Sequence, residues 1–189
     1  MIRLKIGSNF NIFMSATIDI VIPVLNEESA LTHCVAKLFA FTEHHPEWKW
    51  RVVIADNGSV DRTPEIAAQL SEKYNGLSIL RLEERGRGRA LKKAWSESDA
   101  DVRLYMDVDL STGLEALPSL VTSIVDEGYE VAIGSRLSKG SRVVNRSFKR
   151  EVTSRGYNIL IHLFFPLTKF KDAQCGFKAV SRRAAESLV

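Results

Sequence analysis

The chain has 189 residues, of which 45% are hydrophobic and 26% charged, a composition that excludes a wholly disordered protein. Its length suits one domain with a buried core. Its two cysteines exclude a disulfide framework, and their spacing excludes a cysteine-ligated zinc site. With only two cysteines, a reducing compartment is the default expectation. No apolar stretch is long enough for a membrane span or a signal peptide, so we do not expect a secreted protein.

The formal net charge of +3 hides an asymmetry along the chain. Residues 1–133 carry 14 basic and 20 acidic side chains, whereas residues 134–189 carry 12 basic and 3 acidic ones, giving net charges of −6 and +9. An acidic front and a basic back predict that the protein handles a cation in one half and an anion in the other.

Short β-branched runs alternate with helical patterns along the whole chain. This alternation predicts an α/β fold with a mostly parallel central sheet and helices on both of its faces. In such sheets ligands bind beyond the carboxyl ends of the strands, and the carboxylates and glycines of this chain collect there. We expect strands at 17–24, 51–55, 77–82, 102–106 and 131–133, and helices at 28–41, 63–74, 90–96, 114–124 and about 152–163.

Two carboxylates, Asp107 and Asp109, follow the expected strand at 102–106. Residues i and i+2 of extended chain point to the same side, so both carboxylates can face one point. Oxygen ligands of this kind suit Mg²⁺ or Mn²⁺. The alternative is that one aspartate caps the helix expected near Leu114, although Ser111 or Thr112 could do this instead.

The glycine-containing turns at two other strand ends also have two interpretations. Asp56 begins the turn Asp56–Ser59, where it either hydrogen-bonds a nucleoside or forms part of a helix cap. The segment Gly86–Ala90 resembles the start of a dinucleotide fingerprint, but Leu91 stands at the sixth position, so we do not expect a nicotinamide cofactor. We expect a loop that opens a helix, with Arg87 or Arg89 near a phosphate.

Residues 134–157 contain seven basic side chains and one acidic one. A solvated surface is the simplest explanation of such a run. Arg150 and Ser154 lie four residues apart on one helix face, however, and guanidinium groups bind phosphate through two hydrogen bonds. An anionic phosphate or a membrane surface is therefore the expected partner, whereas nucleic acid is not, because aromatic residues are sparse and no recognition motif is present.

The order of these segments resembles glycosyltransferase family 2, which has the GT-A nucleotide-sugar-binding fold. Within that family the chain is most similar to the polyprenyl-phosphate and dolichyl-phosphate mannosyl- and glucosyltransferases. The resemblance covers residues 17–183. It rests on five segments: Ile22–Glu28, Asp56–Thr63, Gly86–Leu91, Asp107–Ser111 and Asp172–Lys178.

The resemblance implies a role for particular residues. Asp109 and Asp172 are the catalytic candidates, and Asp107 and Asp109 hold the metal. Arg136, Arg150 and Ser154 match positions that bind phosphate on the acceptor side, which Asp172 also lines. Donor binding is implied for Pro23, Leu25, Glu27, Ile54, Asp56, Asp107, Val108, Asp109 and Ser111.

The function expected from this resemblance is inverting transfer of a hexose from UDP-glucose or GDP-mannose to a polyprenyl phosphate. The enzyme would use Mg²⁺ or Mn²⁺ and act peripherally at the cytoplasmic face of a membrane, with a membrane protein or a second copy as a further partner. One alternative is a saccharide hydroxyl acceptor, for which Asp172 would be the general base. Another is a nucleotide-sugar-binding remnant without activity.

The expected domain organisation is an N-terminal extension at residues 1–16 and a catalytic domain at residues 17–189. Members of the family usually continue well past the Gly-Phe-Lys motif, which here is Gly176–Lys178. We therefore expect the catalytic domain to be truncated at its C-terminus.

Overall fold

Seven strands form one sheet in the order β1-β6-β7-β5-β2-β3-β4. The structure is a computed structural model that describes residues 2–5, 15–83, 85–134 and 175–188. The edge strand β1 lies within the stretch expected as an N-terminal extension. The strands are β1 (Ile2–Lys5), β2 (Thr17–Val24), β3 (Lys49–Asp56), β4 (Leu77–Arg81), β5 (Val102–Met106), β6 (Tyr129–Ile133) and β7 (Phe177–Ser181).

Most of the strands run in one direction. β2 pairs in parallel with β3 and β5, and β3 pairs in parallel with β4. β7 is antiparallel to both β5 and β6, and β1 is antiparallel to β6. Five of the seven strands therefore share a direction, with β1 and β7 reversed, and the prediction of a mostly parallel sheet is confirmed.

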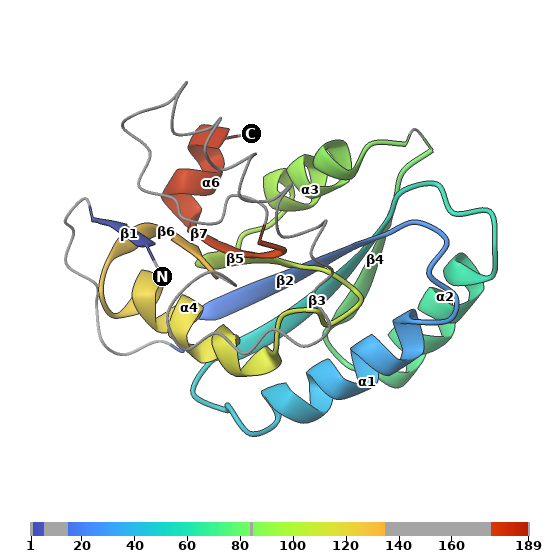
Figure 1. Ribbon diagram of the computed structural model, residues 1–189, viewed down its shortest axis with the longest axis horizontal. Helices are drawn as coiled ribbons and strands as arrows, with labels where there is room; N and C mark the ends of the chain where they lie inside the picture. The colour runs from blue at the N-terminus through green and yellow to red at the C-terminus, as the bar shows by residue number, and fades with distance from the viewer. Residues whose placement is uncertain (1, 6–14, 84, 135–174, 189) are drawn as a thin grey trace, which may run out of the picture.

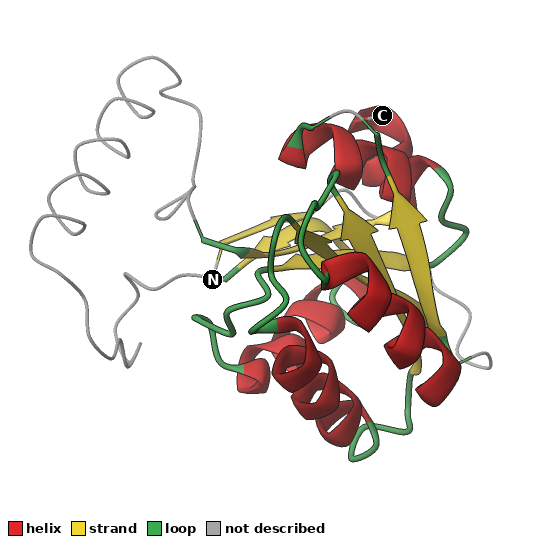
Figure 2. Ribbon diagram, turned by 90° about the vertical axis from the view of Figure 1, so that its right-hand side faces the viewer, coloured by secondary structure: helices red, strands yellow, loops and turns green. Residues whose placement is uncertain are grey.

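Helices cover both faces of this sheet, as expected (Figures 1 and 2). One face packs against α1 (Leu31–Thr42), α2 (Thr63–Lys73) and α4 (Leu117–Val125), which follows the short 3₁₀ helix η1 (Leu114–Ala116). The other face packs against α3 (Arg87–Ser96) and α6 (Arg182–Leu188). No helix among the described residues combines enough length with enough apolar character to cross a membrane.

Alternation along the central strands separates the two hydrophobic cores. In β2, Ile20 and Ile22 point into the larger core under α1, α2 and α4, whereas Val21 points into the smaller core under α3 and α6. In β5, Leu104 belongs to the larger core and Tyr105 to the smaller one. Side chains that alternate with Leu104 on the same side as Tyr105 therefore face α3 and α6.

The predicted elements differ from the observed ones mainly at their ends and near the C-terminus. The first helix begins at Leu31 instead of Glu28, because Glu28 takes part in a turn: its carboxylate accepts the N–H of Arg62 at 3.0 Å. Neither β7 nor α6 was predicted, and the first two residues of β7, Phe177 and Lys178, were interpreted only as part of a motif. The helix expected at about 152–163 lies outside the described residues.

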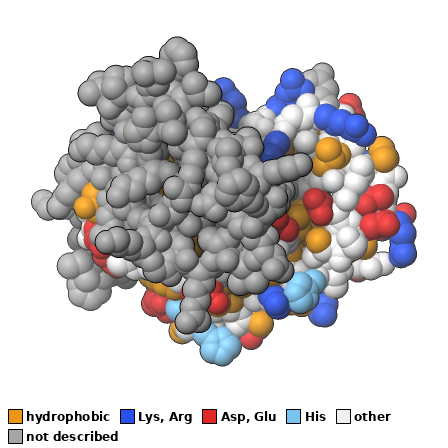
Figure 3. All heavy atoms as spheres, viewed as in Figure 1, with side chains coloured by type: hydrophobic (Ala, Val, Ile, Leu, Met, Phe, Trp, Pro, Cys, Tyr) orange, Lys and Arg blue, Asp and Glu red, His pale blue; other side chains and the backbone are white. Residues whose placement is uncertain are grey.

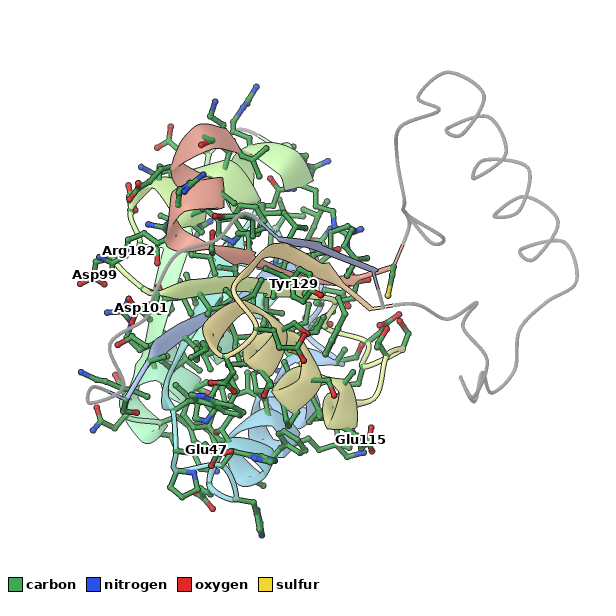
Figure 4. All side chains as sticks on the ribbon, turned by 90° about the vertical axis from the view of Figure 1, so that its left-hand side faces the viewer. Glu47, Asp99, Asp101, Glu115, Tyr129 and Arg182 are labelled. Atoms are coloured by element: carbon green, nitrogen blue, oxygen red, sulfur yellow. The ribbon has the colours of Figure 1, made fainter. Side chains whose placement is uncertain are left out.

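Ion pairs stabilise the amino-terminal edge of the sheet. Arg51 donates to both carboxylate oxygens of the buried Asp19, at 2.6 and 2.9 Å, and also to Asp99 at 2.6 Å. Arg182 forms an ion pair with Asp101 at 3.1 Å, and Figure 4 shows Asp99, Asp101 and Arg182 together on one side of the molecule. Each of these carboxylates has a basic partner, so this edge has a structural role.

Candidate active site

Loops from several strands meet at the opposite edge of the sheet. The carboxyl ends of β2, β3, β4 and β5 lie there because these neighbouring strands are parallel. β7 runs in the reverse direction, so its first residue, Phe177, lies at the same edge, paired with Met106 at the end of β5. Glu115, which follows the β5 loop, is labelled on the side of Figure 4 away from Asp99.

Side chains of each loop bind the backbone of the other where β2 and β3 end. Asn26 has a positive φ of 56°, and its side-chain oxygen accepts the N–H of Val60 at 2.9 Å. Its own N–H donates to the Ser59 hydroxyl at 3.0 Å, and the N–H of Glu27 donates to Thr63 at 2.8 Å. These bonds fix the loop after β2, so that Leu25 remains 37% exposed beside the site.

Asp56, the last residue of β3, has one carboxylate oxygen available for a ligand. Its side chain is 1% exposed, and its Oδ1 accepts the N–H of Ser59 at 3.0 Å. Its Oδ2 accepts no hydrogen bond from the part of the chain that is described, and the Nε of Arg81 lies 3.7 Å away. Because a buried carboxylate oxygen normally has a donor, this oxygen is suited to accept an N–H from a bound molecule.

The glycine-containing loop before α3 is joined to the same region. The side-chain oxygen of Asn57 accepts the N–H of Gly86 at 2.7 Å. This bond places Arg87, the first residue of α3, near the end of β5. There its guanidinium contacts both the Tyr105 hydroxyl and Oδ1 of Asp107.

Tyr105 and Asp107 lie two residues apart and point to the same side, as the strand alternation requires. The Tyr105 hydroxyl donates to Oδ1 of Asp107 at 2.6 Å. Burial raises the pKa of Tyr105, whereas the charge of Arg87 acts in the opposite direction. The phenol therefore stays protonated at neutral pH and serves as the donor of this bond.

The second oxygen of Asp107 packs against Gly176, just before β7. A Cβ atom added at Gly176 would lie 1.8 Å from Oδ2 of Asp107, so only glycine fits beside this carboxylate. Nearby, the Lys178 ammonium donates to the carbonyl of Cys175 at 2.6 Å and lies 5.5 Å from the centre of the Tyr105 ring. Asp107 is thus enclosed by Arg87, Tyr105 and the start of β7.

Asp109 is the more exposed of the two neighbouring aspartates. Its Oδ1 accepts the N–H of Ser111 at 2.9 Å, in a turn where Leu110 has a positive φ of 52°. Burial and, to a lesser extent, the charge of Asp109 raise the pKa of the Cys34 thiol in α1 to about 12. Asp109 is therefore exposed to solvent and also close enough to α1 for its charge to act on Cys34.

The carboxylates fit a hard divalent cation that also binds a ligand. Mg²⁺ and Mn²⁺ accept carboxylate oxygens, and Mg²⁺ commonly takes one or two carboxylates together with water and substrate phosphates. Within the described ranges, no group of three or more His, Cys, Asp or Glu residues could hold a metal by itself. Asp107 and Asp109 can therefore contribute ligands, and the remaining positions would belong to water and phosphate.

The structure brings some of the expected site residues together at this edge. They are Leu25, Glu27, Asp56, Asp107, Asp109 and Ser111. Ile54 is fully buried in the larger core and Val108 is 7% exposed, so both serve packing, while Pro23 is half-buried within β2. The expected residues Arg136, Arg150, Ser154 and Asp172 lie outside the described residues.

Sequence reasoning did not single out Tyr105, and it included Gly176 and Lys178 only as members of the segment Asp172–Lys178, without a role in this site. Tyr105 could have been found from the two-residue period that also directs Asp107 toward α3. No sequence signal placed Gly176 or Lys178 beside Asp107, because that proximity depends on β7 inserting between β5 and β6.

Known structures identify the class of fold. The chain superposes on the mannosyltransferase PcManGT of Pyrobaculum calidifontis, in complex with GDP-Man and Mn²⁺, with a TM-score of 0.64 and 18% identity. That match covers 93% of this chain and 47% of the other. The architecture is the GT-A fold of nucleotide-sugar glycosyltransferases. More particularly, the chain belongs to glycosyl transferase family 2, whose family model matches residues 19–189.

Curated relatives agree with this assignment. The glycosyltransferase AglD of Haloferax volcanii is 36% identical over 90% of this chain and 27% of its own length. A dolichol-phosphate mannosyltransferase of Pyrococcus furiosus is 32% identical over 90% of this chain and 48% of its own. A dolichyl-phosphate beta-glucosyltransferase of Drosophila melanogaster is 30% identical, over 92% and 57% respectively. The chain thus spans roughly a quarter to just over half of the length of these relatives.

Proposed function

We propose that this protein transfers a hexose from a nucleoside-diphosphate sugar to a polyprenyl or dolichyl phosphate, with a divalent cation and with inversion at the anomeric carbon. The observation that carries the proposal is the group of carboxylates at the carboxyl ends of β3 and β5. Asp56 presents a buried oxygen that has no hydrogen-bond donor in the part of the chain that the structure describes, and Asp107 and Asp109 lie at the end of β5, two strands from β3 in the sheet.

Asp56 and the pair Asp107 and Asp109 act on different parts of the nucleotide sugar. Oδ2 of Asp56 accepts an N–H of the nucleobase, which both uracil and guanine can supply. Leu25 is exposed at the end of β2 and offers an apolar surface to the base or ribose. Asp107 and Asp109 hold the cation, and Glu27 and Ser111 line the same edge. When bound, the cation neutralises negative charge that develops on the departing diphosphate.

The acceptor is proposed from the chemistry of a phosphate and from the names of the relatives. A phosphomonoester has a second pKa of about 6, so at neutral pH it is largely dianionic and needs little activation by a base. Its oxygen forms the new bond to the anomeric carbon while the bond to the diphosphate breaks on the opposite face. Arg136, Arg150 and Ser154 are proposed to bind this phosphate, and Asp172 is proposed to line the acceptor side.

We further propose that the reaction takes place at the cytoplasmic face of a membrane, with the protein bound peripherally. The support for this is the basic character of residues 134–189, which carry a formal net charge of +9. Anionic lipid headgroups attract basic segments, and a polyprenyl phosphate presents its phosphate at the same surface.

A transfer assay with a panel of radiolabelled donors tests the proposal. UDP-glucose and GDP-mannose are supplied separately with a polyprenyl phosphate and Mn²⁺ or Mg²⁺, with EDTA as the metal-free control. Lipid-linked radioactivity that requires a metal supports the proposal. Product formed only on a saccharide hydroxyl, or donor binding without any product, contradicts it.

Replacing Asp56 with asparagine is expected to weaken binding of the nucleotide sugar by about 10- to 100-fold. The amide has a single oxygen, so when that oxygen accepts the N–H of Ser59, its N–H₂ group faces the N–H of the nucleobase, and two hydrogen-bond donors oppose each other. Calorimetry with UDP and GDP in the presence of Mn²⁺ measures the effect. The control is Glu65→Gln, which neutralises an exposed carboxylate on α2 and should leave the affinity unchanged. Equal affinities for Asp56→Asn and the wild type would contradict the assignment.

Replacing Arg150 with alanine is expected to raise KM for the polyprenyl phosphate by about tenfold or more, because a guanidinium–phosphate contact is lost. KM for the donor should stay nearly constant. The neighbouring variant Lys149→Ala removes the same charge and separates a specific contact from a general electrostatic effect. An equal rise in both KM values in Arg150→Ala would show that Arg150 does not bind the acceptor.

A further inference from the structure

We propose that the Arg87 guanidinium forms an ion pair with Asp107 until the sugar donor and the divalent cation bind. The guanidinium then leaves Asp107 and binds the diphosphate of the donor. The inference rests on the proposed function. It gives a defined role to Arg87, for which the sequence predicted only a position near a phosphate and which the proposed function does not use. It also predicts how metal binding and nucleotide binding depend on each other.

The first argument is the position of Arg87. Its guanidinium contacts Oδ1 of Asp107 and the hydroxyl of Tyr105, and its Cζ lies 5.2 Å from the centre of the Tyr105 ring. The Arg87 side chain is nonetheless 60% exposed, against 27% for Asp107. It approaches the carboxylate from solvent and can leave again without disturbing the core.

The second argument is that Asp107 has few directions from which a cation can approach. Its Oδ2 packs against Gly176, and its Oδ1 already receives the Tyr105 hydroxyl and Arg87. Tyr105 is buried and neutral, so it can remain in place beside a metal ion. Arg87 is charged and exposed, so mutual repulsion makes it the group that a divalent cation displaces.

The third argument is the destination of the displaced guanidinium. A diphosphate on a cation held by Asp107 and Asp109 would lie within reach of Arg87, because Arg87 itself contacts Asp107. Guanidinium groups bind phosphate through paired, charge-assisted hydrogen bonds. Figure 3 shows Lys and Arg side chains gathered in the upper part of the described surface, the region of α3 in the same view of Figure 1.

This exchange links the two ligands. Without a nucleotide, Arg87 competes with the metal for Asp107, so the metal binds weakly. With a nucleotide present, Arg87 gains a new partner and the competition is removed. By thermodynamic reciprocity the metal must then strengthen nucleotide binding by the same factor, so Arg87 favours joint binding of both ligands.

The test measures Mn²⁺ binding by electron paramagnetic resonance of the free ion, with and without UDP or GDP. In Arg87→Met we expect the affinity for Mn²⁺ alone to rise by about threefold or more, the scale of one partly exposed ion pair. The affinity for the nucleoside diphosphate with Mn²⁺ should fall by about tenfold, the scale of a charge-assisted hydrogen bond. Arg87→Lys, which keeps the charge without the planar fork, should lie between Arg87→Met and the wild type in both measurements.

Lys93→Met is the matched control. Lys93 lies six residues after Arg87 on the same helix, and its ion-pair partner is Glu97. This variant should change neither affinity by more than about twofold, since only a screened charge is removed. Circular dichroism checks that each variant is folded, and Arg87→Lys keeps the test decisive if Arg87→Met is not.

Unchanged or weaker binding of Mn²⁺ alone in both Arg87 variants would overturn the inference and leave the proposed metal-dependent transfer standing. Failure of the wild type to bind Mn²⁺ even with UDP or GDP would overturn both. Opposite changes in the two affinities support the inference, because a purely structural role of Arg87 would weaken both together.

Discussion

The Asp109→Asn variant is expected to lose transfer to polyprenyl phosphate by about three orders of magnitude, because it removes a negative ligand from the proposed cation site. The fold should be retained. Asp109 is exposed, and the asparagine oxygen can still accept the N–H of Ser111, the bond that Asp109 makes at 2.9 Å. Lipid-linked product from radiolabelled donor measures the loss, and thermal unfolding measures stability.

The control is Asp126→Asn, at the end of α4, which removes one exposed negative charge away from the carboxyl ends of β3 and β5. It should leave both product formation and Tm unchanged. If Asp109→Asn keeps more than about a tenth of the wild-type rate, Asp109 cannot be an essential metal ligand. If Asp109→Asn binds the nucleotide sugar but forms no product, Asp109 is required for the transfer step and not for binding of the donor.

The Gly176→Ala variant is expected to lower the rate of transfer, although residue 176 is not itself one of the carboxylates of the site. The added methyl group would lie 1.8 Å from Oδ2 of Asp107, so the carboxylate must rotate away from Tyr105 and Arg87. We expect a loss of transfer of about 100-fold, as for a misplaced catalytic group. The cost in stability should be about 1–2 kcal/mol, a decrease in Tm of roughly 2–8 °C.

A double-mutant cycle with Asp107→Ala identifies the cause. If the collision with Asp107 is responsible, Gly176→Ala should cost almost no stability in the Asp107→Ala background. Gly88→Ala, where an added Cβ meets nothing within 4 Å, should keep or raise Tm. Additive losses in the cycle would show that the methyl group acts on the backbone and not on Asp107.

Much of the fold could be predicted from periodicity along the chain. The strands at Thr17–Val24 and Val102–Met106 were predicted with their observed ends, because β-branched and apolar runs bounded by polar residues specify buried strands. Helix starts were less predictable. The turn that delays α1 to Leu31 depends on hydrogen bonds to a loop more than thirty residues away.

The candidate site was only partly predictable. The i, i+2 spacing of Asp107 and Asp109 and the position of Asp56 at a strand end can be read from the chain. Their partners cannot. Arg87 reaches Asp107 through the bond between Asn57 and Gly86, and Gly176 reaches it through the strand register that sets Phe177 opposite Met106.

The sequence by itself determined the fold class, the family resemblance and the identity of the strand-end carboxylates, because these depend on local periodicity and on the order of short segments. Only the tertiary structure decided what surrounds each carboxylate. Among the described residues it left one oxygen of Asp56 without a hydrogen-bond donor, enclosed Asp107 between Arg87, Tyr105 and Gly176, and kept Asp109 exposed. These environments depend on β7 running antiparallel between β5 and β6, a pairing between residues that lie more than forty positions apart in the chain.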